Sequence, residues 1–357
     1  MKFSDVLDIR NGRNQRQVEN ANGKYPIYGS GGVMGRATDF ICDAGTVVIG
    51  RKGSINNPIF VDEPFWNVDT AFGLVAHRDV LLPKYLFYFC VNFDFEQLNT
   101  TVTIPSLTKA NLLQIEINVP DMDEQRYVVR VLDKICRLTD LQQQELHNLD
   151  QLVKSRFIEL FASVEAEDTL QNLCTFIDYR GKTPEKVESG LPFITAKNIR
   201  MHRMSFDTLE YISKETYDRV MTRGFPQIGD VVFTTEAPLG NVCRIPFIET
   251  EFYIGQRIIT MQTERLEPAY LEYALSSDEF KRKIAEKSSG STVTGIRSKL
   301  LEQLTIPVPP RAQQERFAAF VEQTDKSKYY SSLSFRYCQA AANTYRQEWM
   351  TCRTSDF

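Results

Sequence analysis

Hydrophobic and polar residues follow two different periods along this 357-residue chain. Residues 1–121 and 164–310 contain short β-branched runs bounded by Gly and Pro, a pattern typical of strands. Residues 122–163 and 311–357 instead place apolar side chains three or four positions apart, as a helix does. The pattern therefore predicts an α+β protein with two strand-rich domains, each followed by a long helix.

The first long helix should run from about residue 123 to residue 161, where the chain contains no Gly or Pro. About 38 residues at about 1.5 Å each give a rod of about 57 Å, which exceeds an ordinary globular helix. The apolar residues of this segment that lie near a heptad spacing are Val131, Ile135, Leu138, Leu149, Leu152 and Leu160.

The second long helix should run from about residue 312 to residue 350. One of its faces has small and polar residues in the middle, so this helix needs a partner. Two such rods favour an antiparallel coiled coil that spaces the two domains. The alternative is that each helix packs only on its own domain, whose radius of gyration would be about 14 Å. The residues of this face are Phe317, Val321, Thr324, Lys328, Ser331, Phe335, Cys338, Ala342, Tyr345 and Trp349.

A long-period repeat relates the two halves of the chain. Five pairs of segments recur in the same order with a slowly drifting offset, which is difficult to obtain by chance. In each half, a strand-rich domain ends in a β-branched run closed by Val-Pro, and a long helix follows. The paired segments are Gly45–Ile49 with Gly229–Phe233, Leu82–Leu86 with Glu267–Leu271, Thr101–Thr103 with Thr292–Thr294, Ile117–Pro120 with Ile306–Pro309, and Glu124–Arg126 with Gln313–Arg316.

The net charge of −4 does not by itself suggest a DNA-binding protein, but the charge is unevenly distributed. Residues 1–60 are net basic, residues 121–168 are net acidic and residues 169–310 are balanced. Because binding to DNA needs a local basic patch and not a basic total, this distribution permits DNA binding without arguing for it.

Metal-binding, secreted and membrane classes are not expected. The seven cysteines are scattered without a Cys-x-x-Cys pair, and the three histidines lie far apart, so we expect no metal site. The first residues lack an apolar secretory signal. The longest apolar stretch, residues 80–91, is broken by Pro83 and is too short to span a bilayer. We therefore expect a cytoplasmic protein with reduced thiols.

No segment has the pattern of a catalytic or cofactor site. Gly29–Gly35 is rich in glycine, but its spacing fits neither the dinucleotide fingerprint nor the Walker sequence, so it indicates a tight turn. Asn57–Phe60 is similar to the Asn-Pro-Pro-aromatic motif of DNA amino-methyltransferases. The glycine-rich cofactor loop and alternating strand–helix pattern that this motif needs are missing. We therefore expect a non-catalytic chain that binds no cofactor.

Polar and basic side chains gather in the turns of both domains. Arg, Lys, Asn and Gln can read base edges in the major groove, and Ser, Thr and Lys mostly hold phosphates. The alternative is that these residues are ordinary solvated loop residues. The candidate DNA-binding residues are Arg13, Asn14, Gln15, Ser30, Arg36, Arg51, Lys52, Asn56, Arg180, Lys182, Thr195, Lys197, Asn198, Arg200, Thr235, Glu236, Gln256, Arg257, Thr292, Thr294 and Arg297.

Several of these stretches resemble the specificity-subunit family of Type I restriction–modification systems. Asp178–Pro184 with Leu191–Ile199 is similar to the opening of a family target-recognition domain. Gly229–Val242, followed by Gln256–Ile259, is similar to the most recognisable strand–turn block of the family. Gly23–Gly29 and Gly45–Ser54 are looser counterparts in the first half.

The resemblance implies that each strand-rich domain reads one half of an asymmetric, bipartite site on double-stranded DNA. It also implies that the helices form a spacer and dock two modification subunits, which bind the methyl donor. Restriction and translocase subunits would join the full complex. Two other hypotheses remain open: a coiled-coil scaffold that bridges protein partners without binding DNA, and a stand-alone DNA-modifying enzyme.

Overall fold

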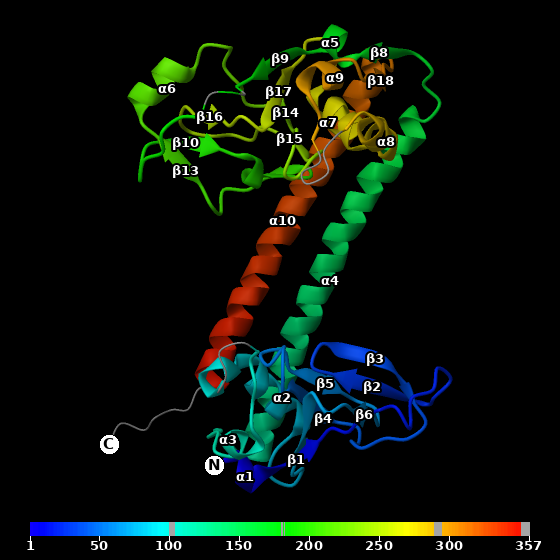
Figure 1. Ribbon diagram of the computed structural model, residues 1–357, viewed down its shortest axis with the longest axis vertical. Coiled ribbons are helices and arrows are strands. Elements are labelled where there is room, and N and C mark those ends of the chain that lie inside the picture. Colours follow the sequence, from blue (N-terminus) through cyan, green and yellow to red (C-terminus); the bar gives the residue numbers. More distant parts are fainter. Residues whose placement is uncertain (100–103, 180, 182, 289–294, 351–357) are drawn as a thin grey trace. The chain divides into compact units, whose positions relative to one another are not determined.

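In a computed structural model, the chain forms two compact units, and each unit combines one strand-rich domain with parts of both long helices (Figure 1). The first unit comprises Met1–Glu145 and the chain from Ser331 on, and the second comprises Leu146–Tyr330. The structure describes residues 1–99, 104–179, 181, 183–288 and 295–350.

The first domain is built on two sheets. An antiparallel sheet has the strand order β1-β7-β4-β5, and a smaller sheet has the order β3-β2-β6, in which β2 and β6 are parallel. The elements before the long helix are α1 (Phe3–Val6), β1 (Leu7–Asn11), β2 (Tyr25–Gly29), β3 (Gly32–Ala37), β4 (Thr46–Gly50), β5 (Ile59–Val61), β6 (Trp66–Asn67), β7 (Ala71–Ala76), α2 (Pro83–Asn92), the 3-10 helix η1 (Phe95–Leu98) and α3 (Lys109–Leu112).

The second domain repeats this plan. An antiparallel sheet has the order β15-β14-β17-β9, and a smaller sheet has the order β13-β10-β16, in which β10 and β16 are parallel. The elements are β8 (Glu167–Thr169), α5 (Leu170–Leu173), β9 (Thr175–Asp178), β10 (Leu191–Ile194), the 3-10 helix η2 (Ala196–Asn198), β11 (Ile199–Arg200), β12 (Arg203–Met204), β13 (Glu210–Ile212), α6 (Lys214–Val220), β14 (Val231–Thr234), β15 (Val242–Arg244), β16 (Tyr253–Ile254), β17 (Ile258–Gln262), α7 (Pro268–Ser276), α8 (Asp278–Lys287), α9 (Ser298–Glu302) and β18 (Thr305–Pro307).

The predicted repeat is confirmed at the level of strand order. The large sheets correspond as β1-β7-β4-β5 and β9-β17-β14-β15, and each small sheet contains one antiparallel and one parallel pair. Strands β4 and β14 are buried at every position, which explains their unbroken β-branched sequences. The paired segments Thr101–Thr103 and Thr292–Thr294 lie outside the described residues. Three of the other predicted pairs fall on equivalent elements, whereas Ile306–Pro309 begins in strand β18 and its counterpart Ile117–Pro120 lies in no helix or strand.

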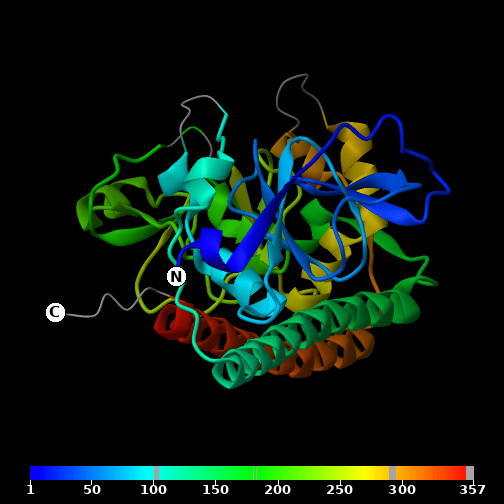
Figure 2. The ribbon, with the colours of Figure 1, turned by 90° about the horizontal axis from the view of Figure 1, so that it is seen from below.

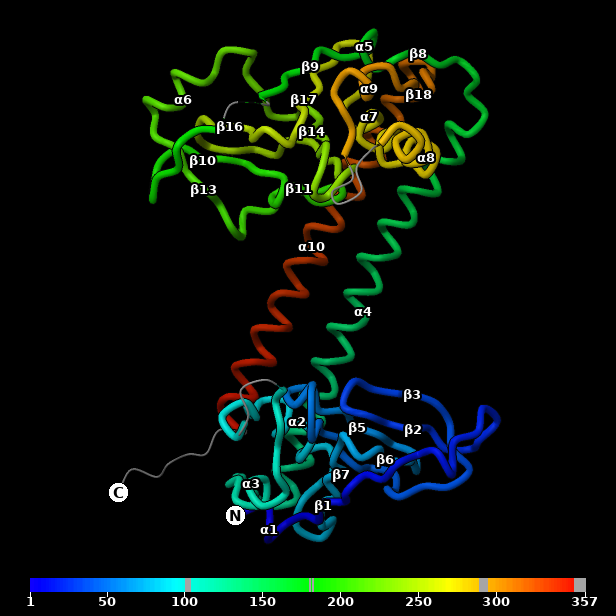
Figure 3. Tube along the Cα trace, viewed as in Figure 1, coloured from blue at the N-terminus to red at the C-terminus, as the bar shows by residue number. Residues whose placement is uncertain are grey.

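The two long helices are confirmed almost to the residue, as α4 (Met122–Phe161) and α10 (Arg311–Met350). The Cα trace of each helix continues without interruption (Figure 3). In the first unit, Val128 near the start of α4 shares a hydrophobic core with Trp349 near the end of α10. In the second unit, the rings of Phe157 and Phe317 lie 5.5 Å apart, so the end of α4 meets the start of α10. The helices therefore run antiparallel, side by side (Figure 2).

The predicted contact face is right for α10 and partly wrong for α4. Every residue predicted for the α10 face is buried or half-buried. On α4, however, Leu138 is 42% exposed and Leu152 is 49% exposed. Fully buried positions of α4 include Val128 and Val153, which the heptad pattern did not pick out. The heptad prediction fails in part because a straight helix of 3.6 residues per turn drifts away from a strict seven-residue repeat.

A buried glutamine joins each long helix to the short helix of its own domain. Gln125 Oε1 accepts a hydrogen bond from the backbone N–H of Leu82 at 2.8 Å, and Gln314 Oε1 accepts one from Glu267 at 2.9 Å. The side-chain amide of each glutamine donates to nearby backbone carbonyls. Because Leu82 and Glu267 are the N-cap residues of α2 and α7, each glutamine satisfies a backbone group that the short helix leaves unpaired.

Candidate nucleic-acid interface

In the second domain, the candidate interface is centred on the edge where β14 and β17 end. Thr234 of β14 pairs with Ile258 of β17, so the next residues, Thr235 and Arg257, lie opposite each other. The backbone N–H and the hydroxyl of Thr235 donate to the carbonyl oxygen of Arg257 at 2.9 and 3.2 Å. Thr235 is buried, and its role is therefore to join two loops that are distant in sequence.

An ion pair lies next to this junction. Arg257 Nε donates to Glu236 Oε1 at 2.8 Å, and the two side chains are 53% and 40% exposed. Glu236 also forms a backbone bridge with Gly295, and the N–H of Ile296 donates to the carbonyl of Thr235 at 3.0 Å. The loop that holds Glu236 is thus fixed on both sides, while the charged groups reach solvent.

A concave surface of about 230 Å³ lies beside the ion pair. Its lining includes cationic, hydroxyl and amide groups, which are the donors that protein–DNA interfaces use, together with the Glu210 carboxylate and the ring of Phe193. The structure therefore brings together four of the predicted residues with one, Lys186, that was not predicted. These five residues are Lys186, Thr195, Lys197, Gln256 and Arg257.

Asn198, also predicted to bind DNA, has an internal role. It is 1% exposed, and its Oδ1 accepts hydrogen bonds from the backbone N–H and the hydroxyl of Thr195, both at 2.9 Å. Its Nδ2 donates to two backbone carbonyls. A buried amide must be satisfied internally, so Asn198 shapes the turn that presents Thr195 and Lys197.

The remaining predicted residues of this domain are less concentrated. Arg200 is exposed on β11, and Arg297 is exposed where the chain leaves the bridge at Gly295 and enters α9. The predicted residues Arg180, Lys182, Thr292 and Thr294 lie outside the described residues.

The first domain has an equivalent edge where β4 and β7 meet. Gly50 pairs with Ala71, and the backbone N–H groups of Arg51 and Lys52 both donate to the carbonyl of Thr70, at 2.8 and 3.2 Å. Lys52 forms a backbone bridge with Ser106. The loop is thus held by the same type of backbone contacts as its counterpart in the second domain.

The turn between β2 and β3 packs against this loop. A Cβ atom added to Gly50 would lie 3.1 Å from Ser30 Cβ, and one added to Gly53 would lie 3.6 Å from Ser30 Oγ. The Arg51 guanidinium lies 5.7 Å from the ring centroid of Phe72. The structure therefore gathers Ser30, Arg51 and Lys52 and confirms the glycine-rich segment as a tight turn.

Two other predicted residues of the first domain are exposed, but their side chains form hydrogen bonds within the domain. The Arg36 guanidinium donates to the carbonyls of Gly23 and Lys24, each at 2.6 Å. Asn56 donates to Asp94 at 2.7 Å and accepts from the backbone N–H of Phe95 at 2.6 Å. These bonds brace hairpins and loops, because exposed backbone groups compete for the same polar side chains.

Arg13, Asn14 and Gln15 lie in the loop after β1. The carbonyl of Arg13 accepts from the Trp66 indole at 3.0 Å, which fixes the backbone and leaves the Arg13 side chain exposed. Asn14 Oδ1 accepts from the backbone N–H of Arg16 at 3.0 Å. This loop remains a candidate contact surface.

Sequence reasoning did not identify Lys186 or Thr70. Lys186 forms an ion pair with Glu210 at 2.8 Å, and Thr70 lies opposite Arg51. Neither residue belongs to a motif or a basic cluster, and both positions depend on strand pairing. The internal repeat offered one signal, because Thr70 precedes β7 as Arg257 precedes the equivalent strand β17.

A network of charges centred on one buried carboxylate connects the second domain to the long helix within the same unit. Glu272 of α7, 2% exposed, pairs with His202 Nδ1 at 2.9 Å and with Arg244 Nε at 2.6 Å. Arg244 also pairs with Asp325 of α10 at 2.9 Å. Burial raises the pKa of Glu272, but the hydrogen bond from His202 and the charge of Arg244 outweigh it, so this pKa lies below its usual value.

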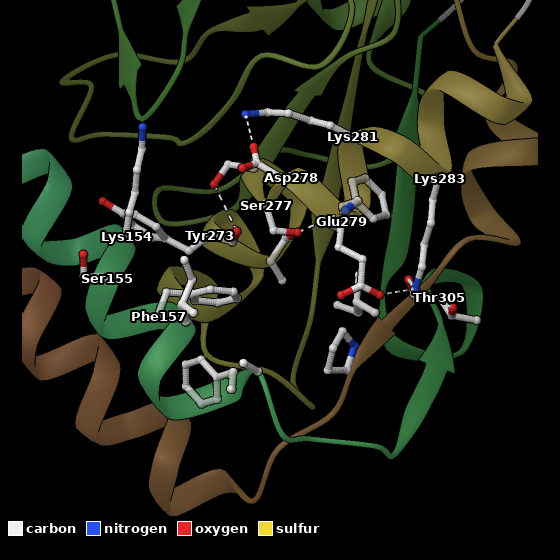
Figure 4. Close-up of a pocket in the computed structure, with 18 of the residues that line it drawn as sticks. Lys154, Ser155, Phe157, Tyr273, Ser277, Asp278, Glu279, Lys281, Lys283 and Thr305 are labelled. Carbon is white, nitrogen blue, oxygen red and sulfur yellow. Dashed lines mark hydrogen bonds and ion pairs between the residues drawn. The ribbon is translucent and has the colours of Figure 1, made fainter.

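The end of α4 forms a second concave surface in the same unit, with α7, α8 and β18 (Figure 4). Its volume is about 440 Å³, with Phe157 and Tyr273 on its apolar side. Lys283 pairs with Glu167 at 2.8 Å and with Glu279 at 3.2 Å at its rim. An apolar floor with a charged rim is the typical form of a surface that binds another protein.

Exposed apolar side chains also occur along the long helices. In the second unit Ile158 is 62% exposed and Tyr330 is 70% exposed, and in the first unit Leu141 is 53% exposed and Tyr337 is 74% exposed. Contiguous patches of exposed apolar groups mark interaction sites, whereas single exposed apolar side chains are ordinary on a protein surface.

The described residues contain neither a cluster of potential metal ligands nor a membrane-spanning helix. Among those residues, no group of three or more His, Cys, Asp and Glu side chains is placed to hold a metal ion. None of the helices in the described ranges is long and apolar enough to cross a membrane.

Known proteins resemble the chain over both halves. The model of the Type I restriction modification DNA specificity domain matches residues 1–151 and 168–329. The specificity subunit of the MjaVIII Type I restriction enzyme of Methanocaldococcus jannaschii is 20% identical over 79% of this chain and 70% of its own length.

Two solved structures have the same fold. The S subunit of a Type I restriction–modification system from M. genitalium superposes with a TM-score of 0.65 and 16% identity, over 99% of this chain and 96% of that chain. A chain from a structure on complex assembly and conformational transition of the Type I system gives a TM-score of 0.56 and 16% identity, over 99% and 97%.

Proposed function

Because the chain belongs to the specificity-subunit family of Type I restriction–modification systems, we propose that its two domains each read one half of a bipartite, asymmetric site on double-stranded DNA. The chain is a non-catalytic subunit that supplies DNA sequence specificity. The proposal adds the two-part site, the partners of the chain and the residues that contact the bases.

The observation that supports the proposal most strongly is the repeated strand edge. Both domains hold a loop at the end of a buried strand with the same backbone contacts, yet the side chains differ. One loop presents Arg51 and Lys52, and the other presents Glu236 opposite Arg257. Two different half-sites require the same backbone support with different side chains, because each base pair offers a distinct pattern of donors and acceptors in the major groove.

The long helices have two roles in the proposal. As an antiparallel pair shared by both units, they space the two reading domains. Their exposed apolar side chains, together with the concave surface at the end of α4, dock two modification subunits. Those subunits bind the methyl donor, this chain binds no cofactor, and restriction and translocase subunits complete the complex.

The test is a domain exchange in the assembled complex. Residues 169–310 would be replaced by the matching domain of a relative, and the chain would be assembled with its modification subunits. Sequencing of methylated DNA should then show one altered half-site and one unchanged half-site. Native mass measurement should give two modification subunits per chain.

An alteration of both half-sites would contradict the independence of the two domains. The scaffold hypothesis makes a different prediction, namely that the complex binds no specific DNA. A filter-binding titration against salt with cognate and scrambled duplexes separates the two, since only specific binding depends on the sequence at constant salt.

A further inference from the structure

We propose that Arg257 and Glu236 act together as the reader of one G·C base pair in the half-site of the second domain, an inference that rests on the proposed function. Arg257 would contact the guanine, and Glu236 would orient Arg257 and accept a hydrogen bond from a base amino group. Membership of the family does not by itself give the identity of the base that this domain reads.

The backbone under this pair is fixed before any DNA binds. Thr235 holds the carbonyl of Arg257 with two hydrogen bonds, and Glu236 follows Thr235 directly. The bridge from Glu236 to Gly295 holds the other side of the loop. Two charged side chains are therefore presented from a rigid strand edge, and less conformational entropy is lost when they bind.

The geometry of the ion pair leaves the reading edge of Arg257 available. Glu236 receives its hydrogen bond from Nε, at 2.8 Å. The two terminal nitrogens of a guanidinium can then donate together to O6 and N7 of guanine, the commonest specific contact in the major groove. The carboxylate accepts from N4 of cytosine, the only amino donor that a G·C pair presents there.

The charges argue against a phosphate contact at this point. A carboxylate close to the DNA backbone is repelled by phosphates, and Glu236 offsets the positive charge of Arg257. A carboxylate is tolerated where it meets base amino groups. The acidic residue at this edge therefore favours base reading over backbone positioning.

The equivalent edge of the first domain lacks this arrangement. By strand register, Lys52 occupies the place of Glu236, and Thr70 occupies the place of Arg257. That edge has cationic side chains without a carboxylate partner in the equivalent position. The Arg–Glu reader thus distinguishes the second domain from the first within one chain.

The experiment compares wild type, Arg257→Gln and Glu236→Gln in complexes with the modification subunits, with methylated sites mapped by sequencing. Arg257→Gln should lower the preference for guanine at one position of the second-domain half-site by about tenfold or more, with adenine gaining, because glutamine pairs with adenine. Glu236→Gln should weaken discrimination at the same base pair. The other half-site should stay unchanged, which also shows that the variant folds and assembles.

The matched control is Arg265→Gln. Arg265 forms an exposed ion pair with Asp168 and is 55% exposed, close to the 53% of Arg257, but it lies outside the strand edge. Its substitution should leave both half-sites unchanged.

Uniformly weaker methylation by Arg257→Gln, with all base preferences kept and the salt slope reduced by about one, would identify a phosphate contact and overturn the inference. An unchanged guanine position would also overturn it. If the wild-type complex recognises no defined two-part site, the proposed function itself is wrong, and the inference falls with it.

Discussion

The loop after β4 in the first domain and the loop after β14 in the second are held by equivalent backbone contacts. The backbone N–H of Arg51 donates to the carbonyl of the residue that precedes the neighbouring strand, and the N–H of Thr235 does the same. Lys52 and Glu236 each form a backbone bridge to the segment before a short helix. The side chains nevertheless differ in charge at the same register position. The sheet therefore fixes the position of the side chain at this edge, while the chemical type of that side chain differs between the two domains.

The same contrast extends to the packing under the two edges. In the second domain, the buried carboxylate of Glu272 on α7 connects His202, Arg244 and α10. By the repeat, the corresponding position on α2 is Phe87, which packs against an apolar core. At this one position of the short helix the second domain therefore has a buried carboxylate and the first domain an aromatic ring, although α2 also binds Asp133 of α4 through Lys84 and Tyr88, each at 2.7 Å.

Among the substitutions that test this difference between the two domains, Glu272→Gln is expected to have the largest effect on stability. Removing one partner of a buried charge network should lower the free energy of unfolding by about 3 kcal/mol at pH 7. The folded-state pKa of Glu272 is depressed, so its contribution is present above the unfolded pKa, about 4.3, and is lost as pH falls through the lower folded value. The difference in the free energy of unfolding between the wild type and Glu272→Gln should therefore become smaller at acidic pH.

Urea unfolding of the full chain at a series of pH values measures this difference. Glu264→Gln is the matched control, because Glu264 is exposed, and its substitution should change stability by about 0.5 kcal/mol at most. A difference for Glu272→Gln that stays constant down to strongly acidic pH would contradict a stabilising carboxylate.

A smaller and symmetric effect is expected for the glutamines that join the long helices to the short ones. Gln125→Ala and Gln314→Ala each leave a partly buried backbone N–H, of Leu82 and of Glu267, without its acceptor, which should cost about 1 to 2 kcal/mol in each unit. Gln144→Ala, at an exposed position of α4, is the control. Urea unfolding would show whether the two losses match; a loss in one unit only would break the equivalence of the two repeats.

The smallest effect is expected for Lys52→Gln. Lys52 occupies in the first domain the register position that Glu236 occupies in the second. A lysine without an adjacent carboxylate suits a phosphate contact, so binding should weaken similarly at all sequences and the salt slope should fall by about one. Lys24→Gln provides an exposed lysine of the same domain for comparison. Filter binding against salt is the measurement, and a changed base preference would place Lys52 among the base readers.

The sequence alone was sufficient for the features that depend on local patterns. A 40-residue helix follows from the absence of Gly and Pro and from a sustained helical period, and both long helices begin and end within one residue of the prediction. The repeat, visible in Gly45–Ile49 and Gly229–Phe233, predicted two domains of one design. These signals are local or periodic, so no knowledge of the tertiary contacts was needed.

Only the tertiary structure decided which polar side chains are available for DNA. Asn198, Arg36 and Asn56 have the right residue types, but Asn198 is buried, and the exposed Arg36 and Asn56 already form hydrogen bonds within their domain. Arg257 meets Glu236 because β14 and β17 pair in one particular register, which joins segments about twenty residues apart in sequence. The composition of a turn shows which donors are present, but strand pairing determines which of them are already satisfied.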